Sequence, residues 1–219
     1  MNFKNLLLSL FLLLFTANLF AQETTPVFSG DKQFFGGLVL GLNVAQVDGD
    51  SYSGFHQAGL NAGGIVYWRF SKPVAASVEL LYSQKGSHNV RQSTDPYAGA
   101  YFSKYSIRLN YAELPLVFHY FLSPKYQIGF GGSYNALISS KESLTLTYPV
   151  HIDENLFPFN KYSIDLIGSI SMVVWNGFML NARYQYGITP VRNYQYVPQG
   201  IGGGNQFNNM VTFRILYLF

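Results

Sequence analysis

The stretch Gly37-Leu38-Val39-Leu40-Gly41-Leu42-Asn43-Val44-Ala45 decides the fold, because leucine and valine recur in it at every second position. Successive side chains of a β-strand point to opposite faces, so a period of two indicates an extended strand. One face carries Leu38, Leu40, Leu42 and Val44. The other face carries Gly37, Gly41, Asn43 and Ala45, which are small or polar. The stretch therefore predicts a strand with one apolar face.

The same alternation recurs in seven further segments, which makes eight predicted strands in all. They are listed by the residues that carry the pattern: 60–70, 76–82, 107–120, 128–138, 164–174, 180–188 and 211–219. The segment 107–120 changes phase, since Ile107 and Tyr111 share one parity with each other and Leu114 and Phe118 share the opposite one. An extra residue near Glu113 would restore a single outer face, and the following Pro115 is typical of bulges and edges. We therefore predict a β-bulge near Glu113.

The connections between these segments alternate in length. Three are tight: Ser71-Lys72-Pro73, Ser123-Pro124-Lys125 and Asn176-Gly177, the last a strong hairpin signal. Four are long: residues 48–55, 86–104, 140–161 and 190–208. Long loops on one side and short turns on the other are typical of bacterial outer-membrane barrels, with the turns in the periplasm. The fold class predicted is thus all-β: an eight-stranded antiparallel up-and-down transmembrane β-barrel.

Composition separates this barrel from a soluble β-sandwich or lipocalin-like barrel. Aromatic residues make up 17% and charged residues 11% of the chain, whereas soluble domains are about 25% charged. The charges within strands nearly balance, which suits a narrow interior filled with paired charges better than a solvated exterior. This predicted lumen network comprises Arg69, Glu79, Lys85, Arg108, Glu113, Asp165, Arg183 and Arg214. Its predicted role is structural, and a proton or ion path is the alternative.

The first residues have the pattern of a secretory signal. Lys4 precedes the apolar run Leu6–Phe15, and a cleavage site is expected after Ala21. We therefore expect a signal peptide at 1–21 and a barrel domain at 22–219, located in the cell outer membrane of a Gram-negative bacterium. Cysteine is absent, so a lipoprotein anchor and cysteine metal sites are not expected. The net charge is +3, and the basic residues form no stripe along the sequence that would suggest nucleic-acid binding.

Four stretches resemble the PorT-like outer-membrane β-barrel family, which is common in Bacteroidetes. They are Gly54–Leu60, Glu79–Gly86 ("ELLYSQKG"), Leu109–Leu116 ("LNYAELPL") and Leu180–Gly187. The resemblance extends from about Gly36 to the last residue and implies the barrel fold and the outer membrane. The namesake of the family is linked to type IX secretion, and a role for this chain there would rest on family analogy alone.

The predicted function is a membrane scaffold or interaction component, not an enzyme, with no cofactor. Its expected partners are outer-membrane lipid and a protein that contacts the long loops. The alternatives are a lipid-modifying enzyme and a narrow channel. Ser87 and His88 offer no catalytic spacing, because adjacent strand residues point to opposite faces. His119 lies in a predicted strand near a predicted periplasmic turn, and we interpret it as lumen packing. His151, Asp153 and Glu154 form a weak cation-site candidate, and we interpret them as solvated loop residues.

Two other features of the predicted long loops bear on function. Gly202-Gly203-Gly204 is predicted to be a flexible loop tip, because no Gly-Lys-Ser/Thr sequence follows it. Aromatic residues in the long loops belong either to strand extensions and the interfacial girdle or to a contact surface for a partner. They are Tyr97, Tyr101, Phe102, Phe157, Phe159, Tyr194 and Tyr196.

Overall fold

The computed structural model describes residues 28, 32–50, 54–95, 99–145, 149–150, 156–175, 177–198 and 202–219. The predicted signal peptide and the candidate cation site at His151–Glu154 lie outside these residues, so both stay predictions. Among the described residues, no helix is long and apolar enough to cross a membrane.

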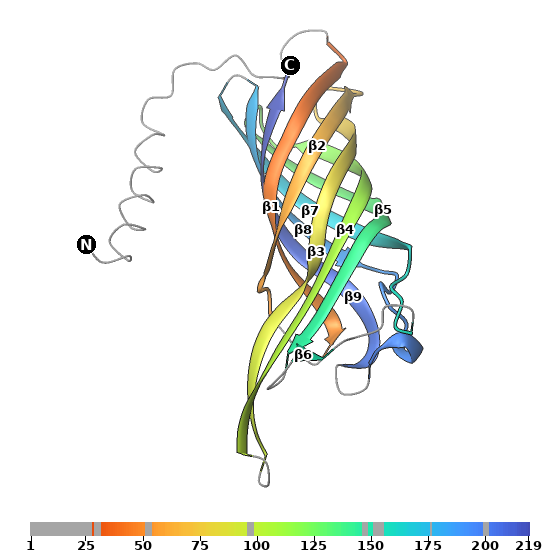
Figure 1. Ribbon diagram of the computed structural model, residues 1–219. Helices are drawn as coiled ribbons and strands as arrows, with labels where there is room; N and C mark the ends of the chain where they lie inside the picture. Colours follow the sequence, from red (N-terminus) through yellow and green to blue (C-terminus); the bar gives the residue numbers. More distant parts are fainter. Residues whose placement is uncertain are drawn as a thin grey trace, which may run out of the picture.

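Eight long antiparallel strands close into a ring, which confirms the predicted fold class (Figure 1). The strands are β1 (Phe34–Asp50), β2 (Gln57–Arg69), β3 (Val74–Asp95), β4 (Gly99–Phe121), β5 (Tyr126–Thr145), β7 (Tyr162–Trp175), β8 (Phe178–Gly187) and β9 (Gly202–Leu218). Each of these eight strands pairs with the next one along the chain, and the pairing of β1 with β9 closes the ring. The two-residue strand β6 (Pro149–Val150) pairs antiparallel with the end of β5, and a 3₁₀ turn, η2 (Tyr194–Tyr196), precedes β9.

The two ends of the barrel differ. The three short connections, between β2 and β3, β4 and β5, and β7 and β8, lie at one end, which we call the turn end. The opposite end, called the loop end, carries the long connections and a projecting hairpin of β3 and β4 (Figure 1). Gly177 in the last short turn has a φ of 79°, a left-handed conformation that glycine adopts without a steric penalty.

Side chains alternate between a packed lumen and an apolar outer surface. Along β7, Ile164, Leu166 and Ile170 face outward while Ser163 and Asp165 are buried. Outward aromatic side chains gather near both ends of the strands, as the stacked pairs Phe34–Trp68 and Tyr134–Tyr162 illustrate. A surface that is apolar in the middle and aromatic at its borders matches the lipid-facing band of a transmembrane barrel.

The predicted bulge near Glu113 is wrong. Along β4 the odd-numbered residues face the lumen without interruption, so Ile107, Leu109 and Tyr111 are buried on the same side as Glu113. The register shift lies instead in the partner strand, where Asn110 pairs with Ser139 and Tyr111 pairs with Leu137. Ile138 is thus the extra residue. The sequence pattern misled because the lumen is apolar at this level.

Pro115 occupies the middle of β4 and faces the lumen. The ladder between β3 and β4 omits the pairs that would join Glu79 and Leu80 to Pro115 and Leu114. Proline has no N–H to donate, and the sheet accommodates it here by losing local pairing rather than by a bulge. The register on either side of the gap is unchanged.

All four predicted long loops are partly strand, and two of them differ most from the prediction. Most of the predicted loop 86–104 forms the outer parts of β3 and β4, which remain paired up to Asp95 and Gly99. Gly202, Gly203 and Gly204 are not a loop tip, because they begin β9 and Gly202 pairs with Asp50. In both places strand pairing continues beyond the apolar pattern from which strands were predicted.

Candidate functional site

The lumen is filled in layers along its axis. An apolar cluster that includes Phe35, Val39 and Leu216 lies near the turn end. Another, which includes Ile107, Leu109 and Tyr111, lies near the loop end. Charged side chains lie between them in two groups. We call these the turn-side cluster (Glu79, Arg183 and Arg214) and the loop-side cluster (Lys85, Glu113 and Asp165).

The turn-side cluster joins β3, β8 and β9 through one carboxylate. Arg183 Nη2 donates to Glu79 Oε1 and Arg214 Nη1 donates to Glu79 Oε2, both at 2.6 Å. The second guanidinium also donates through Nε to Asn181 Oδ1 at 2.8 Å, and Asn181 in turn donates to Ser171 Oγ. All three charged side chains are at most 2% exposed. A single carboxylate therefore pairs with two arginines away from solvent.

The loop-side cluster joins β3, β4 and β7 through one ammonium group. Lys85 Nζ lies 2.6 Å from Asp165 Oδ2 and 3.3 Å from Glu113 Oε2. It also donates to Asn135 Oδ1 at 3.0 Å, and Gln185 donates to Glu113 Oε1 at 2.6 Å. Buried charges require this kind of pairing and hydrogen bonding to be tolerated.

Two of the eight predicted lumen residues lie elsewhere. Arg108 is exposed on the outer side of β4, because the buried parity there belongs to Ile107 and Leu109. Arg69 lies at the turn end and donates to the carbonyl oxygens of Phe28 and Ser71. The remaining six form two clusters, so the expectation of one continuous network through Arg108 is wrong.

A phenylalanine from the segment before β1 closes the turn end. Phe28 is 6% exposed, and its ring lies 5.0 Å from Phe35, 5.4 Å from Tyr67 and 4.9 Å from Phe121, with edge-to-face geometry. We call these four residues the turn-end plug. The sequence reasoning missed Phe28, since it precedes the first strand pattern.

Four side chains close the loop end, and we call them the loop-end cap: Tyr105, Glu142, Phe159 and Arg192. The guanidinium of Arg192 binds both carboxylate oxygens of Glu142, at 3.0 and 2.6 Å, and stacks 3.6 Å above the Phe159 ring. The Tyr105 hydroxyl donates to the same carboxylate. Burial, together with that carboxylate, raises the pKa of Tyr105, which lies beyond the apolar band. The hydroxyl therefore stays protonated as a donor.

Next to the cap, hydrogen bonds join the connection between β5 and β7 to the connection between β8 and β9. Asn160 donates its backbone N–H to the Val191 carbonyl at 2.7 Å and its side-chain amide to the Pro190 carbonyl at 2.8 Å. Neither Arg192 nor Glu142 was predicted as a lumen residue. Glu142 follows the bulge at Ile138, which inverts the parity, and Arg192 lies in a segment whose sequence predicts an exposed loop.

One serine–histidine pair is present in the lumen. Ser77 Oγ lies 2.8 Å from His119 Nε2, and the histidine ring packs 4.7 Å from Tyr67. Both residues are nearly inaccessible, at 1% and 3% exposure. No group of three His, Asp or Glu side chains that could hold a metal ion occurs among the described residues. The pair therefore packs within the lumen.

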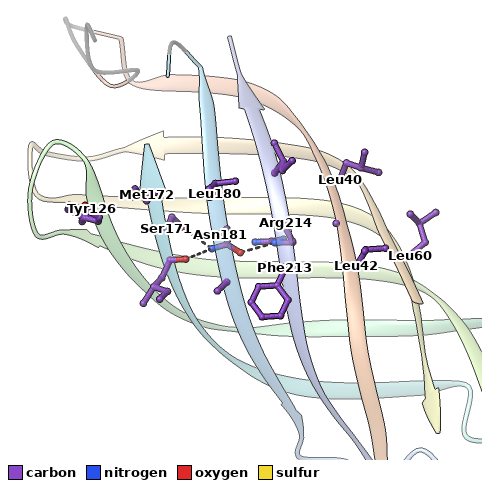
Figure 2. Close-up of a pocket in the computed structure, with 14 residues that line it drawn as sticks. Leu40, Leu42, Leu60, Tyr126, Ser171, Met172, Leu180, Asn181, Phe213 and Arg214 are labelled. Atoms are coloured by element: carbon purple, nitrogen blue, oxygen red, sulfur yellow. Dashed lines mark hydrogen bonds between the residues drawn. The ribbon is translucent and has the colours of Figure 1, made fainter. Parts of the chain in front are cut away.

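An apolar hollow of about 850 Å³ lies across β1, β9, β8 and β7 (Figure 2). Outward side chains such as Leu40, Leu180 and Phe213 line it, along with Arg214 of the turn-side cluster and its hydrogen-bond partner Asn181. Figure 2 shows the hydrogen bonds from Arg214 to Asn181 and on to Ser171 beside these apolar groups. Hydrocarbon suits such a surface better than a polar ligand.

Comparison with known proteins gives one family match. A family model described as "Outer membrane protein beta-barrel domain" matches residues 20–193. No curated protein matches the sequence. Among solved structures, the chain is similar to Ail, the attachment invasion locus protein of Yersinia pestis. The identity is 9% and the TM-score 0.45, over 86% of this chain and 100% of that one. Neisserial surface protein A (NspA) has 10% identity and a TM-score of 0.32, over 87% of this chain and 100% of that one.

Proposed function

This chain belongs to the outer membrane protein beta-barrel domain family, and from that premise we propose that it acts as a non-enzymatic scaffold that presents its loop end to a protein partner. The protein is an outer-membrane barrel in contact with lipid. The observation that carries the proposal is the filled lumen. Two ionic clusters, which are neutral only together, lie between the turn-end plug and the loop-end cap. The interior of the membrane body is thus filled, and a hairpin projects from its loop end.

A planar-bilayer conductance record of the purified monomer tests the scaffold against the channel. We expect no steady current at moderate voltage, because packed side chains occupy the interior of an eight-stranded barrel. The matched control is Arg192→Ala, which removes the cap ion pair but leaves both ionic clusters. Steady conductance by the unaltered protein would overturn the scaffold proposal in favour of the narrow channel.

The lipid-modifying enzyme is the second candidate, and the Ser77–His119 contact is the observation that favours it. Mass spectrometry of lipid A from cells that contain or lack the protein tests it. Under the scaffold proposal the two spectra are the same. If a lipid A modification disappears with the protein and is not restored by Ser77→Ala, the chain is an enzyme instead.

The orientation in the membrane is part of the proposal. With the short turns in the periplasm, protease added to intact cells cuts only connections at the loop end. A tag inserted at Asn176 stays shielded until the outer membrane is opened. Labelling of that tag in intact cells would invert the barrel and remove the basis for a partner site outside the cell.

Membership of the PorT-like subgroup, with a place in a type IX secretion complex, is the finer form of this proposal. It is supported by the "ELLYSQKG" and "NYAELPL" motifs. The test is a mild-detergent pull-down of the tagged protein from outer membranes, followed by mass spectrometry. Co-purification with type IX components is expected, and their absence would restrict the proposal to a scaffold outside that system.

A further inference from the structure

The hairpin of β3 and β4 extends beyond its neighbours on both sides. The ladder between β2 and β3 ends at the pair Asn61–Ser83, and the ladder between β4 and β5 ends at Lys104–Thr145. The hairpin itself stays paired up to Asp95 and Gly99. In the described part of the chain, no strand pairs with β3 beyond Ser83 on the side away from β4. Figure 1 shows this hairpin projecting from the loop end.

The backbone groups that face this open edge can be identified by parity. A Cβ added at Gly63 or Gly59 would collide with the carbonyl oxygens of Leu80 and Gln84, so even-numbered residues of β3 direct these groups toward β2. The register with β4 is constant from Leu81 to Asp95, which preserves the alternation through the extension. The N–H and C=O groups of His88, Val90, Gln92 and Thr94 therefore face outward.

One hydrogen bond supports this assignment independently. The backbone N–H of Val90 donates to the side-chain oxygen of the preceding Asn89 at 2.7 Å, and not to β4. A partner strand would replace this side-chain oxygen with a backbone carbonyl as the acceptor for the Val90 N–H. Val90 itself is 53% exposed, so the position is open to a partner.

We propose that the free edge of β3, residues 87–95, binds an extended polypeptide segment of a partner protein, which adds to the sheet as a further strand. A row of alternating N–H and C=O groups is complementary to another strand, and not to a lipid or a sugar. The segment is longer than a typical strand of about five to six residues. It contains no proline or lysine, the residues that commonly block exposed edges.

A second copy of this chain fits the edge poorly. Copies in one membrane point their hairpins the same way, so two β3 edges would run parallel about a twofold axis along the strands. In parallel pairing a residue bonds to the two residues that flank the one opposite it. The twofold axis instead places each even-numbered residue of one copy opposite the same residue of the other copy. The flanking odd-numbered residues, whose N–H and C=O groups would be needed as partners, face β4 instead. The occupant is therefore a different polypeptide.

The test uses the folded barrel in lipid nanodiscs and a synthetic peptide with the sequence of residues 99–106. This peptide copies the strand that already pairs with β3 on its other edge. With the peptide at about ten times its dissociation constant, we expect amide hydrogen exchange to slow about tenfold at Val90, Gln92 and Thr94. The amides of Asn89, Arg91 and Ser93 should be unchanged, because they already face β4.

Matched controls make the result specific to the edge. Val90→Pro removes an outward donor and should abolish the slowing, whereas Val90→Thr keeps the donor and should preserve it. Absence of slowing, or equal slowing at even and odd positions, would overturn the inference. If amide exchange at the even positions slows with increasing barrel concentration in the absence of peptide, the edge binds a second copy of this chain. That result would overturn the inference as well.

This inference rests on the proposed function, and the two can fail separately. If Val90→Pro leaves capture of a partner at the loop end unchanged in intact cells, the edge is not the site and the scaffold function stands. If removing the whole loop-end hairpin, residues 88–103, also leaves capture unchanged, the proposed presentation of the hairpin fails too.

Discussion

The two ionic clusters of the lumen have opposite compositions. The turn-side cluster places one carboxylate between two arginines, and the loop-side cluster places one ammonium group between two carboxylates. The first therefore carries an excess positive charge and the second an excess negative charge. The two are neutral only together, and β3 contributes the central residue of each, Glu79 and Lys85.

The difference matters because the surplus groups respond differently to acid. A carboxylate that loses its cation can take up a proton and become neutral, whereas a guanidinium cannot lose its proton in a protein. Removing the central residue of the turn-side cluster thus leaves a buried charge that pH does not relieve. The same change in the loop-side cluster leaves charges that acid removes.

The largest effect is expected from Glu79→Gln. This change keeps the shape of the side chain but leaves Arg183 and Arg214 without a countercharge, which should cost about 3–5 kcal/mol of unfolding free energy. Urea titration of the barrel in lipid vesicles measures it. Since replacing a whole buried ionic group by apolar residues is often neutral, adding Arg183→Met and Arg214→Met should restore most of the stability. If that triple variant is as unstable as the single one, shape rather than charge governs this layer.

Lys85→Met comes next, with an expected cost of about 3 kcal/mol near neutral pH because two carboxylates lose their partner. Lowering the pH toward about 4 protonates carboxylates, so the loss relative to the unaltered barrel should shrink. Glu79→Gln, titrated in parallel, should show no such recovery. Equal pH dependence in both variants would contradict the comparison between the clusters.

A charge on the other face of the same sheet extends the comparison to the membrane. Leu166 follows Asp165 on β7, but it faces outward and is 45% exposed. Leu166→Arg should cost about 2–4 kcal/mol, as expected for a cation on the lipid face near the midplane of a barrel. Leu166→Ala in the same vesicles is the control for lost apolar contact. An arginine variant no less stable than the alanine variant would show that β7 has the opposite orientation.

The sequence predicts the strands, and for most of them also which alternate residues face the lumen. This works wherever the outer face is apolar and the inner face is polar, because the two-residue periodicity is then visible. Around Ile107 and Leu109 both faces change character, since the interior is apolar and the outside carries Arg108. Periodicity alone then assigns the strand to the wrong face. The cap residues Glu142 and Arg192 escape detection for a related reason. Their positions depend on a bulge in β5 and on a connection that folds inward, and neither has a local sequence signal.

The smallest effect is expected from Arg108→Gln, which separates the two faces at the point where sequence reasoning failed. Arg108 is exposed on β4, beyond the apolar band, so its replacement should change the unfolding free energy by less than about 0.5 kcal/mol. Leu109→Gln, one residue along the strand, brings an amide into the buried cluster with Ile107 and Tyr111 and should cost about 1–3 kcal/mol. Both are measured by urea titration in lipid vesicles. If the arginine variant loses more stability than the leucine variant, then Arg108 points into the lumen, the outer half of β4 is inverted, and the exposed edge of its partner strand β3 must be reassigned with it.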